Sequence, residues 1–447
     1  MLGMKIKILF WWDELREKIW FIPSVFCFIA VAIVTASLTV DRVLADSPDS
    51  WLLVFETTGA SGRIILGALI GSLVTVMGLV FSLTVLSVSQ TSSQYGPRLI
   101  RSVFDSNVAQ NTMGLVLATV VFCMIVLRTI RDLESTGSLF TPHLSILLAE
   151  LAGGTCIFAL LAFTSHVTRC MRAETLIQGV YSDLLNAAHH IFPEVQDEFA
   201  VVAVERWESI EDGIRLKNDK AGYLQAIELP GLVASAEEHG DCVQIEKKIG
   251  EFVYRGAELA RIQIQASEHD STEDKLQHYR SFFLLGTTRT PRQDIEAGVL
   301  ELVEAGVRAL SPGINDPMTA INVIDYVSSF LRNLANREWP KSVLVDKNGI
   351  PRVRVRSIRF PSVLDAGFNQ LRQNAGSSVA VTCRLLEGLI AIAEAAKRPE
   401  DRQAIHRQSE MILRAAERVI EEQNDLAEIR NRAEALVKIE APFADSH

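Results

Sequence analysis

The feature that most constrains this chain is the run Ile64–Val88, which contains no charged side chain. At about 1.5 Å per helical residue, the run is long enough to cross the roughly 30 Å hydrocarbon core of a bilayer. It therefore predicts a membrane-spanning helix. We expect this helix to continue to Gln94, because Gly96 and Pro97 then break the helical pattern.

The same run is rich in small and hydroxylated residues, and it contains the Gly67–Gly71 GxxxG pattern. At 100° per residue the hydroxyl side chains fall within roughly a quarter of the helix circumference. Small residues of this kind allow close helix packing, with hydroxyls bonding across the contact. Alternatively, copies of the helix surround an axis and the stripe lines a polar pathway. The pore-lining residues on this second hypothesis are Ser72, Thr75, Leu79, Ser82, Leu86 and Ser89, and its cytoplasmic pore mouth is Gln90, Gln94 and Arg98.

Three further apolar runs predict a domain of four transmembrane helices over residues 19–172. The spans are expected at about 19–40, 64–90, 108–127 and 144–167, after an interfacial amphipathic segment over residues 1–18. Four crossings place both termini on one side of the membrane. Lys and Arg near the membrane favour a cytoplasmic terminal side. That side would hold Lys5, Lys7, Arg16, Lys18, Arg98, Arg101, Arg169 and Arg172, against Arg42, Arg63, Arg128 and Arg131 on the other.

Two ionisable side chains, Glu150 and His166, fall within the fourth span. Such groups are costly inside a membrane, so they usually face protein or water. His166 could be a pH-sensitive or ion-facing group, or simply an interfacial residue. His166 and Cys170 have the spacing of metal ligands, but two ligands alone are a weak signal. We therefore predict no metal site.

The net charge of −10 falls entirely beyond the predicted membrane domain. The chain has 44 basic and 54 acidic residues, and the first 174 residues hold 12 of each. An acidic soluble part argues against nucleic acid as a partner. The six cysteines occur singly, without a CxxC pair, which fits a reducing compartment and no disulfide framework.

Residues 173–440 predict an α+β cytoplasmic domain. We expect a helix and a small β-rich part over residues 173–290, with a β-sandwich or barrel-like element. A mainly helical part follows over residues 291–440, with a β-hairpin near 343–359 that turns at Asn348-Gly349, and residues 441–447 form a tail. Predicted strands include Leu224–Leu229, Val243–Lys247 and Leu259–Ile264.

Gly250 and Gly256 predict a tight hairpin ending near Leu259. The G-x-x-V-x-x-G-x-x-L pattern resembles the hairpin of biotinyl and lipoyl modules. The Met-Lys-Met motif that carries the cofactor in such modules is absent. We therefore interpret the segment as structural and expect no cofactor.

The most specific soluble motif is SPGINDP, Ser311–Pro317. It interrupts an amphipathic pattern over Gln293–Leu310 and predicts a turn, after which Asn315 or Asp316 caps a helix that begins at Pro317. The competing hypothesis is a ligand or partner site at this turn. Its candidate residues are Arg289, Arg292, Asp294, Ser311, Asn315 and Asp316.

Several of these segments together resemble a family of bacterial predicted membrane proteins, the domain of unknown function 2254. The resemblance rests on FSLTVLSVSQTSSQYGPRLIR, on the fourth span closing with His166, on GEFVYRGAEL and on RTPRQD followed by RALSPGINDPMTA. It covers nearly the whole chain. It implies an integral inner-membrane protein with a cytoplasmic domain, and it supplies no reaction. One departure is Ser165-His166, where the family pattern leads us to expect paired histidines.

Two functions follow as hypotheses. The first is a homo-oligomeric ion channel or permeation pathway in the inner membrane, lined by the second span and regulated by the cytoplasmic domain. The second is a membrane-anchored sensor or scaffold that binds an unknown small molecule, ion or protein partner at SPGINDP. We do not expect an enzyme, since the chain has no G-x-S-x-G, HExxH or Walker A motif, nor a GxGxxG between a strand and a helix.

Overall fold

The structure is a computed structural model that describes residues 20–45, 58–96, 107–130, 140–170, 172–192, 207–264, 272–291 and 293–440. It divides into two compact units, one formed mainly by the chain up to Leu176 and one by the chain from Ile177 onward. The predicted interfacial segment 1–18 and the tail 441–447 lie outside the described residues.

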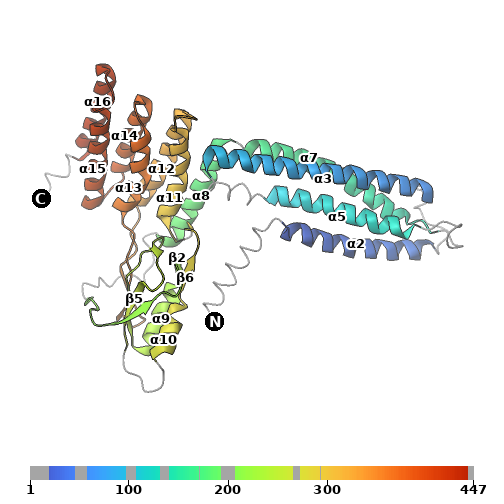
Figure 1. The fold of residues 1–447 in the computed structure, drawn as a ribbon, viewed down its shortest axis with the longest axis horizontal. Helices are drawn as coiled ribbons and strands as arrows, with labels where there is room; N and C mark the ends of the chain where they lie inside the picture. The colour runs from blue at the N-terminus through green and yellow to red at the C-terminus, as the bar shows by residue number, and fades with distance from the viewer. Residues whose placement is uncertain are drawn as a thin grey trace. The chain divides into compact units, whose positions relative to one another are not determined.

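The first unit consists of four long apolar helices (Figure 1). They are α2 (Phe21–Ala45), α3 (Gly59–Tyr95), α5 (Asn107–Thr129) and α7 (His143–Cys170). Each is long and apolar enough to cross a membrane, so the prediction of four apolar helices is confirmed. Helix α3 ends directly before Gly96, whose φ of 108° suits glycine, and Pro97 follows in the sequence.

Helix α5 is the central element of this unit, while α3 lies at its edge. In the apolar window of α5, 56% of the residues are buried, against 17% for α3. The buried side of α3 is a narrow stripe with a repeat of seven residues: Leu66, Leu73, Val80 and Ser87. Partly buried residues such as Ile70 and Met77 flank this stripe, and the exposed remainder of the α3 surface is available to lipid or to another chain.

Two polar side chains secure helix ends in this unit. Asp41 of α2 accepts hydrogen bonds at the start of α7, and Arg63 of α3 donates to the carbonyl of Ile130, just beyond α5. Each charge has the sign that complements the dipole of the helix end it contacts. These helix ends are therefore held by charge as well as by packing.

The second unit begins with most of α8 (Ala173–Ile191) and continues into two small sheets (Figure 1). The five-stranded sheet has the order β1-β5-β3-β8-β7, and the three-stranded sheet has the order β4-β2-β6. The strands are β1 (Ile214–Lys217), β2 (Gly222–Ile227), β3 (Cys242–Ile245), β4 (Phe252–Val253), β5 (Glu258–Gln263), β6 (Phe283–Gly286), β7 (Val343–Val345) and β8 (Pro351–Arg354). Helices α9 (Leu229–His239) and α10 (Thr272–Arg280) join them.

The two sheets and the two helices share one hydrophobic core. Its buried members include Leu224 of β2, Leu232 of α9, Val243 of β3, Ile262 of β5 and Tyr279 of α10. The expected strands near 224, 243 and 259 are present. Strands β1 and β6 and helix α10 were not predicted.

The hairpin expected between Gly250 and Leu259 is wrong as a strand pair. The turn exists, and Gly250 and Gly256 both have positive φ values, 84° and 80°. However, β4 pairs with β2, whereas β5 pairs with β1 and β3. The local glycine pattern identifies the turn, but the partners of each strand come from elsewhere in the chain.

The hairpin near 343–359 is confirmed. Strands β7 and β8 pair antiparallel around Gly349, and β8 also pairs in parallel with β3. This pairing crosses the boundary that the sequence suggests at residue 290. The β-rich part and the helical part are therefore interleaved along the chain.

The remaining helices form three successive pairs, which stand side by side in Figure 1. They are α11 (Ile295–Ala309) with α12 (Pro317–Ala335), α13 (Phe360–Asn374) with α14 (Val379–Ala393), and α15 (Pro399–Ala416) with α16 (Gln423–Glu440). Glycines permit close approach within this stack: Gly306 packs on Leu371, and Gly388 packs on Ser328.

Candidate functional site

The predicted pore-lining residues of α3 all lie on its exposed side. Ser72, Thr75, Ser82 and Ser89 are exposed, and Leu79 and Leu86 are 51% and 54% exposed. The described helices of the same chain therefore leave this face uncovered. No helix in the described part of the chain packs closely against the stripe, so both interpretations of it concern contacts with other chains.

The hydroxyl groups on this face donate their protons to their own helix. Thr75 and Ser82 donate to the carbonyls of Gly71 and Gly78, each at 2.9 Å, and Ser72 donates to Leu69 at 3.0 Å. This back-bonding satisfies the O–H without an outside partner. What these side chains present outward is therefore an oxygen with free lone pairs.

The glycines of α3 add no bulk to this face. A Cβ added at Gly67, Gly71 or Gly78 would meet no described atom within 4 Å. The glycines at other helix contacts behave differently, because a Cβ at Gly153 of α7 would lie 2.8 Å from Leu69. The side of α3 that carries Gly67, Gly71 and Gly78 is therefore available to a neighbouring helix from outside the chain. We call this side the glycine face of α3.

The other polar candidates of the first unit lie apart from one another. Gln90 and Gln94 are exposed on the last turns of α3, and Arg98 lies outside the described residues. On α7, Glu150 is exposed and His166 is half-buried four turns further along. Among the described side chains, no group of three His, Cys, Asp or Glu residues is arranged to hold a metal ion.

The SPGINDP turn is built largely by its own backbone. The amides of Ile314 and Asn315 donate to the Ser311 carbonyl, and Asn315 adopts a positive φ of 49°. Asp316 caps α12 by accepting from the Thr319 amide at 3.1 Å and from its hydroxyl at 2.6 Å. These hydrogen bonds, led by the Thr319 hydroxyl, lower the pKa of Asp316. The expected cap and the Pro317 start of the helix are confirmed.

The tip of this turn exposes apolar side chains. Ile314 is 44% exposed and Met318 is 64% exposed, and Pro312 is exposed beside them. A carboxylate already occupies the N-terminus of α12, so an anion would be repelled there. The turn thus suits a contact with a protein surface better than the binding of an anion.

Arg289 and Asp294 form a second polar cluster at the other end of α11. The Arg289 guanidinium binds both carboxylate oxygens of Asp294, at 2.6 and 2.8 Å, and Asp294 also caps α11 through the Ala297 amide. A Cβ at Gly250 would collide with Asp294, so this position of the turn requires glycine. Lys248 and Glu296 pair beside them. The cluster locks the turn before β4 to the start of α11.

The candidate turn residues are therefore not brought together as one site. Asp294 precedes α11 and Ser311 follows it, and this helix of 15 residues is about 22 Å long. Arg289 and Asp294 lie at one end, and Ser311, Asn315 and Asp316 lie at the other. Arg292 lies outside the described residues.

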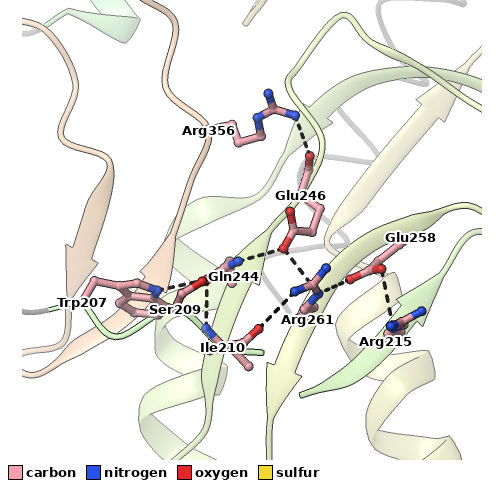
Figure 2. A network of polar contacts seen from close by, with 9 residues as sticks. All are labelled: Trp207, Ser209, Ile210, Arg215, Gln244, Glu246, Glu258, Arg261 and Arg356. Atoms are coloured by element: carbon pink, nitrogen blue, oxygen red, sulfur yellow. Dashed lines mark hydrogen bonds and ion pairs between the residues drawn. The ribbon is translucent and has the colours of Figure 1, made fainter. Parts of the chain in front are cut away.

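A polar network that the sequence analysis did not single out covers part of the five-stranded sheet (Figure 2). The side-chain oxygen of Gln244 accepts hydrogen bonds from the indole of Trp207 and the amide of Ile210, both at 3.2 Å. Its amide nitrogen donates to Glu246 at 2.8 Å, and Arg261 links Glu246 to Glu258. The network holds residues 207–210 against β3, and its groups satisfy one another, which indicates a structural role.

Comparison with known proteins gives one matching family. The family described as "Predicted membrane protein (DUF2254)" matches residues 16–391. Uncharacterized proteins of Mycobacterium tuberculosis and Mycobacterium bovis are 27% identical over 429 residues, which cover 94% of this chain and 80% of each relative. No solved structure matches the chain. The matched region includes all four apolar helices.

Proposed function

Because the chain belongs to the DUF2254 family of predicted membrane proteins, we propose that it forms a homo-oligomeric ion channel or permeation pathway. Helix α3 lines this pathway, and the α+β unit regulates it. The protein would reside in the bacterial inner membrane with both termini in the cytoplasm. The proposal assigns the chain no enzymatic activity, no cofactor and no nucleic-acid partner.

The observation that carries this proposal is the uncovered face of α3. Its residues combine glycines that tolerate close approach with hydroxyl groups in one stripe, and the described part of the chain places nothing against them. In a membrane, small residues favour contact between helices. Copies of α3 around an axis would bury the glycines between neighbours and turn the hydroxyl stripe inward.

The hydrogen bonds of the stripe favour cations as the permeant species. The Ser72, Thr75 and Ser82 protons are donated to carbonyls of α3. Oxygen lone pairs are thus directed toward the pathway, and oxygen atoms are the ligands of hard cations. Leu79 and Leu86, on the same face, would act as hydrophobic constrictions that gate by losing water.

The test is current across planar bilayers that contain the purified, reconstituted full-length protein. Discrete openings are expected, and Ser82→Leu or Thr75→Leu should change their conductance. A matched control is Thr155→Leu on α7, because Thr155 is also exposed and also donates to the carbonyl four residues earlier at 2.9 Å. Unchanged currents in both α3 variants, with intact assembly, would remove the pore assignment.

A second candidate function rests on the SPGINDP turn, whose exposed Ile314 and Met318 favour a contact with a protein partner. In that case the four helices serve as an anchor and the α+β unit is a sensor or scaffold. Thermal-shift screening with nucleotides, metals and organic anions tests the ligand version of this idea. Asn315→Ala should then impair the response without changing permeability, and Ile314→Ser with Met318→Gln should weaken partner binding.

A further inference from the structure

A cavity of about 540 Å³ lies between α3 and the first turns of α5. Its apolar wall is formed by Phe81, Val85 and Val88 of α3 with Met113 of α5. Its polar end is formed by Ser89 and Ser92 of α3 with Gln110 of α5. Because both helices belong to one chain, the cavity exists before any oligomer forms. We refer to it as the α3–α5 groove.

The groove has the length and the polarity of one leaflet of a bilayer. Phe81 and Ser92 are eleven residues apart, which corresponds to about 16 Å along a helix. Half of a hydrocarbon core is about 15 Å thick. Up to Val88 the wall is apolar except for Thr84, and Ser89, Ser92 and Ser93 follow. This order is that of an acyl chain followed by a polar head group.

Gln110 supplies the second, independent observation. Its side chain is 5% exposed, and its carbonyl oxygen, Oε1, has no hydrogen-bond partner among the residues that the structure describes. A buried acceptor without a donor is costly, and few native groups remain in that state. Gln110 lines the groove, and its Oε1 is enclosed by neighbouring atoms. A donor on the molecule that fills the groove would therefore reach Oε1 once the Gln110 side chain turns toward the groove.

The groove occupies a different part of α3 from the proposed oligomer contact. At 100° per residue, Phe81, Val85 and Val88 lie about a third of the circumference from Leu79, Ser82 and Leu86. Only Ser89, at the border, belongs to both sets. A neighbouring chain seated on the hydroxyl stripe therefore leaves the groove open to lipid. Gly71 and Gly78 lie on the same side of the helix as Val85, but they precede the groove along α3.

We propose that the α3–α5 groove binds one phospholipid whose head group carries a hydrogen-bond donor. One acyl chain lies along Phe81, Val85, Val88 and Met113. The head group donates to Gln110 Oε1, and the hydroxyls of Ser89 and Ser92 flank it. A head group without O–H or N–H donors leaves Gln110 unsatisfied, so the groove discriminates among lipids by donor chemistry.

The experiment uses the full-length protein in vesicles made from glycerol-headed, ethanolamine-headed or choline-headed phospholipid. Each vesicle contains a small share of the same lipid with a photoreactive diazirine in its acyl chain. After illumination, mass spectrometry of peptides locates the label. In the wild-type protein, the peptides that contain residues 81–93 and 109–113 should be labelled at least fivefold more than other exposed segments of α3 and α7.

Two variants test the site and its donor preference. Ala109→Phe places a ring in the groove and should reduce labelling there at least fivefold, whereas Ala162→Phe, the same change at an exposed position of α7, should leave it unchanged. The glycerol and ethanolamine lipids should label the groove several-fold more than the choline lipid. Gln110→Leu should abolish that difference while retaining labelling of the groove.

Each outcome of the labelling experiment supports or overturns one part of the proposal. A stronger signal from the glycerol or from the ethanolamine lipid would identify the hydroxyl or the ammonium as the donor. Labelling of the groove no greater than elsewhere, or unchanged by Ala109→Phe, would overturn the site. Equal labelling by all three lipids would overturn the role of Gln110. Chain-to-chain cross-links at Val88→Cys, with no lipid label, would show that a second copy fills the groove.

Discussion

The carboxylate of Asp41, near the end of α2, accepts hydrogen bonds from both the backbone amide and the hydroxyl of Ser145, at 3.1 and 2.6 Å. The amide of Leu144 donates to the same carboxylate at 2.9 Å. Asp41 therefore caps α7 from another helix, more than a hundred residues away in the sequence. Its carboxylate accepts hydrogen bonds from backbone amides that, like the first amides of every helix, have no partner within the helix.

Replacing Asp41 should destabilise the four-helix unit. Asp41→Ala removes the cap and leaves the Leu144 and buried Ser145 amides without their acceptor, although the Ser145 hydroxyl can still donate to Ser37 at 2.9 Å. We therefore expect a loss of about 2–4 kcal/mol. The measurement is thermal unfolding of the purified full-length protein in detergent. Asp219→Ala is the control, because Asp219 is exposed and its one ion pair, with Arg280, contributes about 0–1 kcal/mol. Equal losses in the two variants would contradict the capping role.

The two helix caps of α11 and α12 offer a matched comparison. Asp294 and Asp316 have nearly identical backbone angles, with φ of −111° and −112° and ψ of 84°. Asp316→Ala should cost about 1 kcal/mol, the value of a cap. Asp294→Ala should cost about 3 kcal/mol, because it also removes the bidentate partner of the half-buried Arg289, which then keeps only the 3.8 Å ion pair with Glu296. Chemical unfolding of both variants measures the difference, and similar losses would show that the ion pair adds nothing.

Acid should weaken the second unit through Glu296. Burial raises the pKa of Glu296, but hydrogen bonds from Lys248 and Ser362 outweigh burial and hold it below the usual value. A lowered folded-state pKa stabilises the fold above the unfolded value, about 4.3, and this contribution is lost as the pH falls through the folded value. Thermal unfolding between pH 6 and pH 3 should therefore depend less on pH in Glu296→Gln. Glu434→Gln, an exposed change on α16, should retain the wild-type dependence.

A bulky side chain on the glycine face of α3 should disrupt the proposed oligomer. Gly78→Leu fills the space that a neighbouring helix would occupy, and we expect the dissociation constant to rise at least tenfold, about 1.4 kcal/mol. Gly154→Leu on α7 is matched, since a Cβ there also meets no described atom within 4 Å. Single-molecule counting of labelled chains in bilayers measures the oligomer. Dissociation by both variants, or by neither, would place the contact elsewhere.

The sequence predicts the elements that depend on local pattern. Long uncharged runs identify α2, α3, α5 and α7, and Asp316 with Pro317 identifies the start of α12. Helix α10 was not predicted, because its buried face amounts to little more than Lys275 and Tyr279. Strands β1 and β6 are four residues each, too short for a clear alternation.

The sequence pattern does not show which distant segments of the chain pack or pair with one another. The glycines at 250 and 256 specify a turn, yet β4 and β5 join different sheets because each finds its neighbours through the shared core. Likewise, Arg289 and Asp294 are close enough in sequence to be expected as a pair. Helix α11 is unbroken, and it therefore separates Arg289 and Asp294 from Ser311, Asn315 and Asp316. Gln110 was visible as a polar residue at the start of a span, but the groove it lines depends on how α3 and α5 pack.

The parallel pairing of β3 with β8 also sets an order for biosynthesis. Val243 pairs with Val353, 110 residues later, and ribosomes add about 5–20 residues per second. After its own residues emerge, β3 must therefore wait roughly 5–20 s for its second neighbour. During that interval one edge of the sheet is open to pairing with other chains. A nascent chain of this protein is thus most in need of chaperone protection between the synthesis of the first sheet strands and that of residue 354.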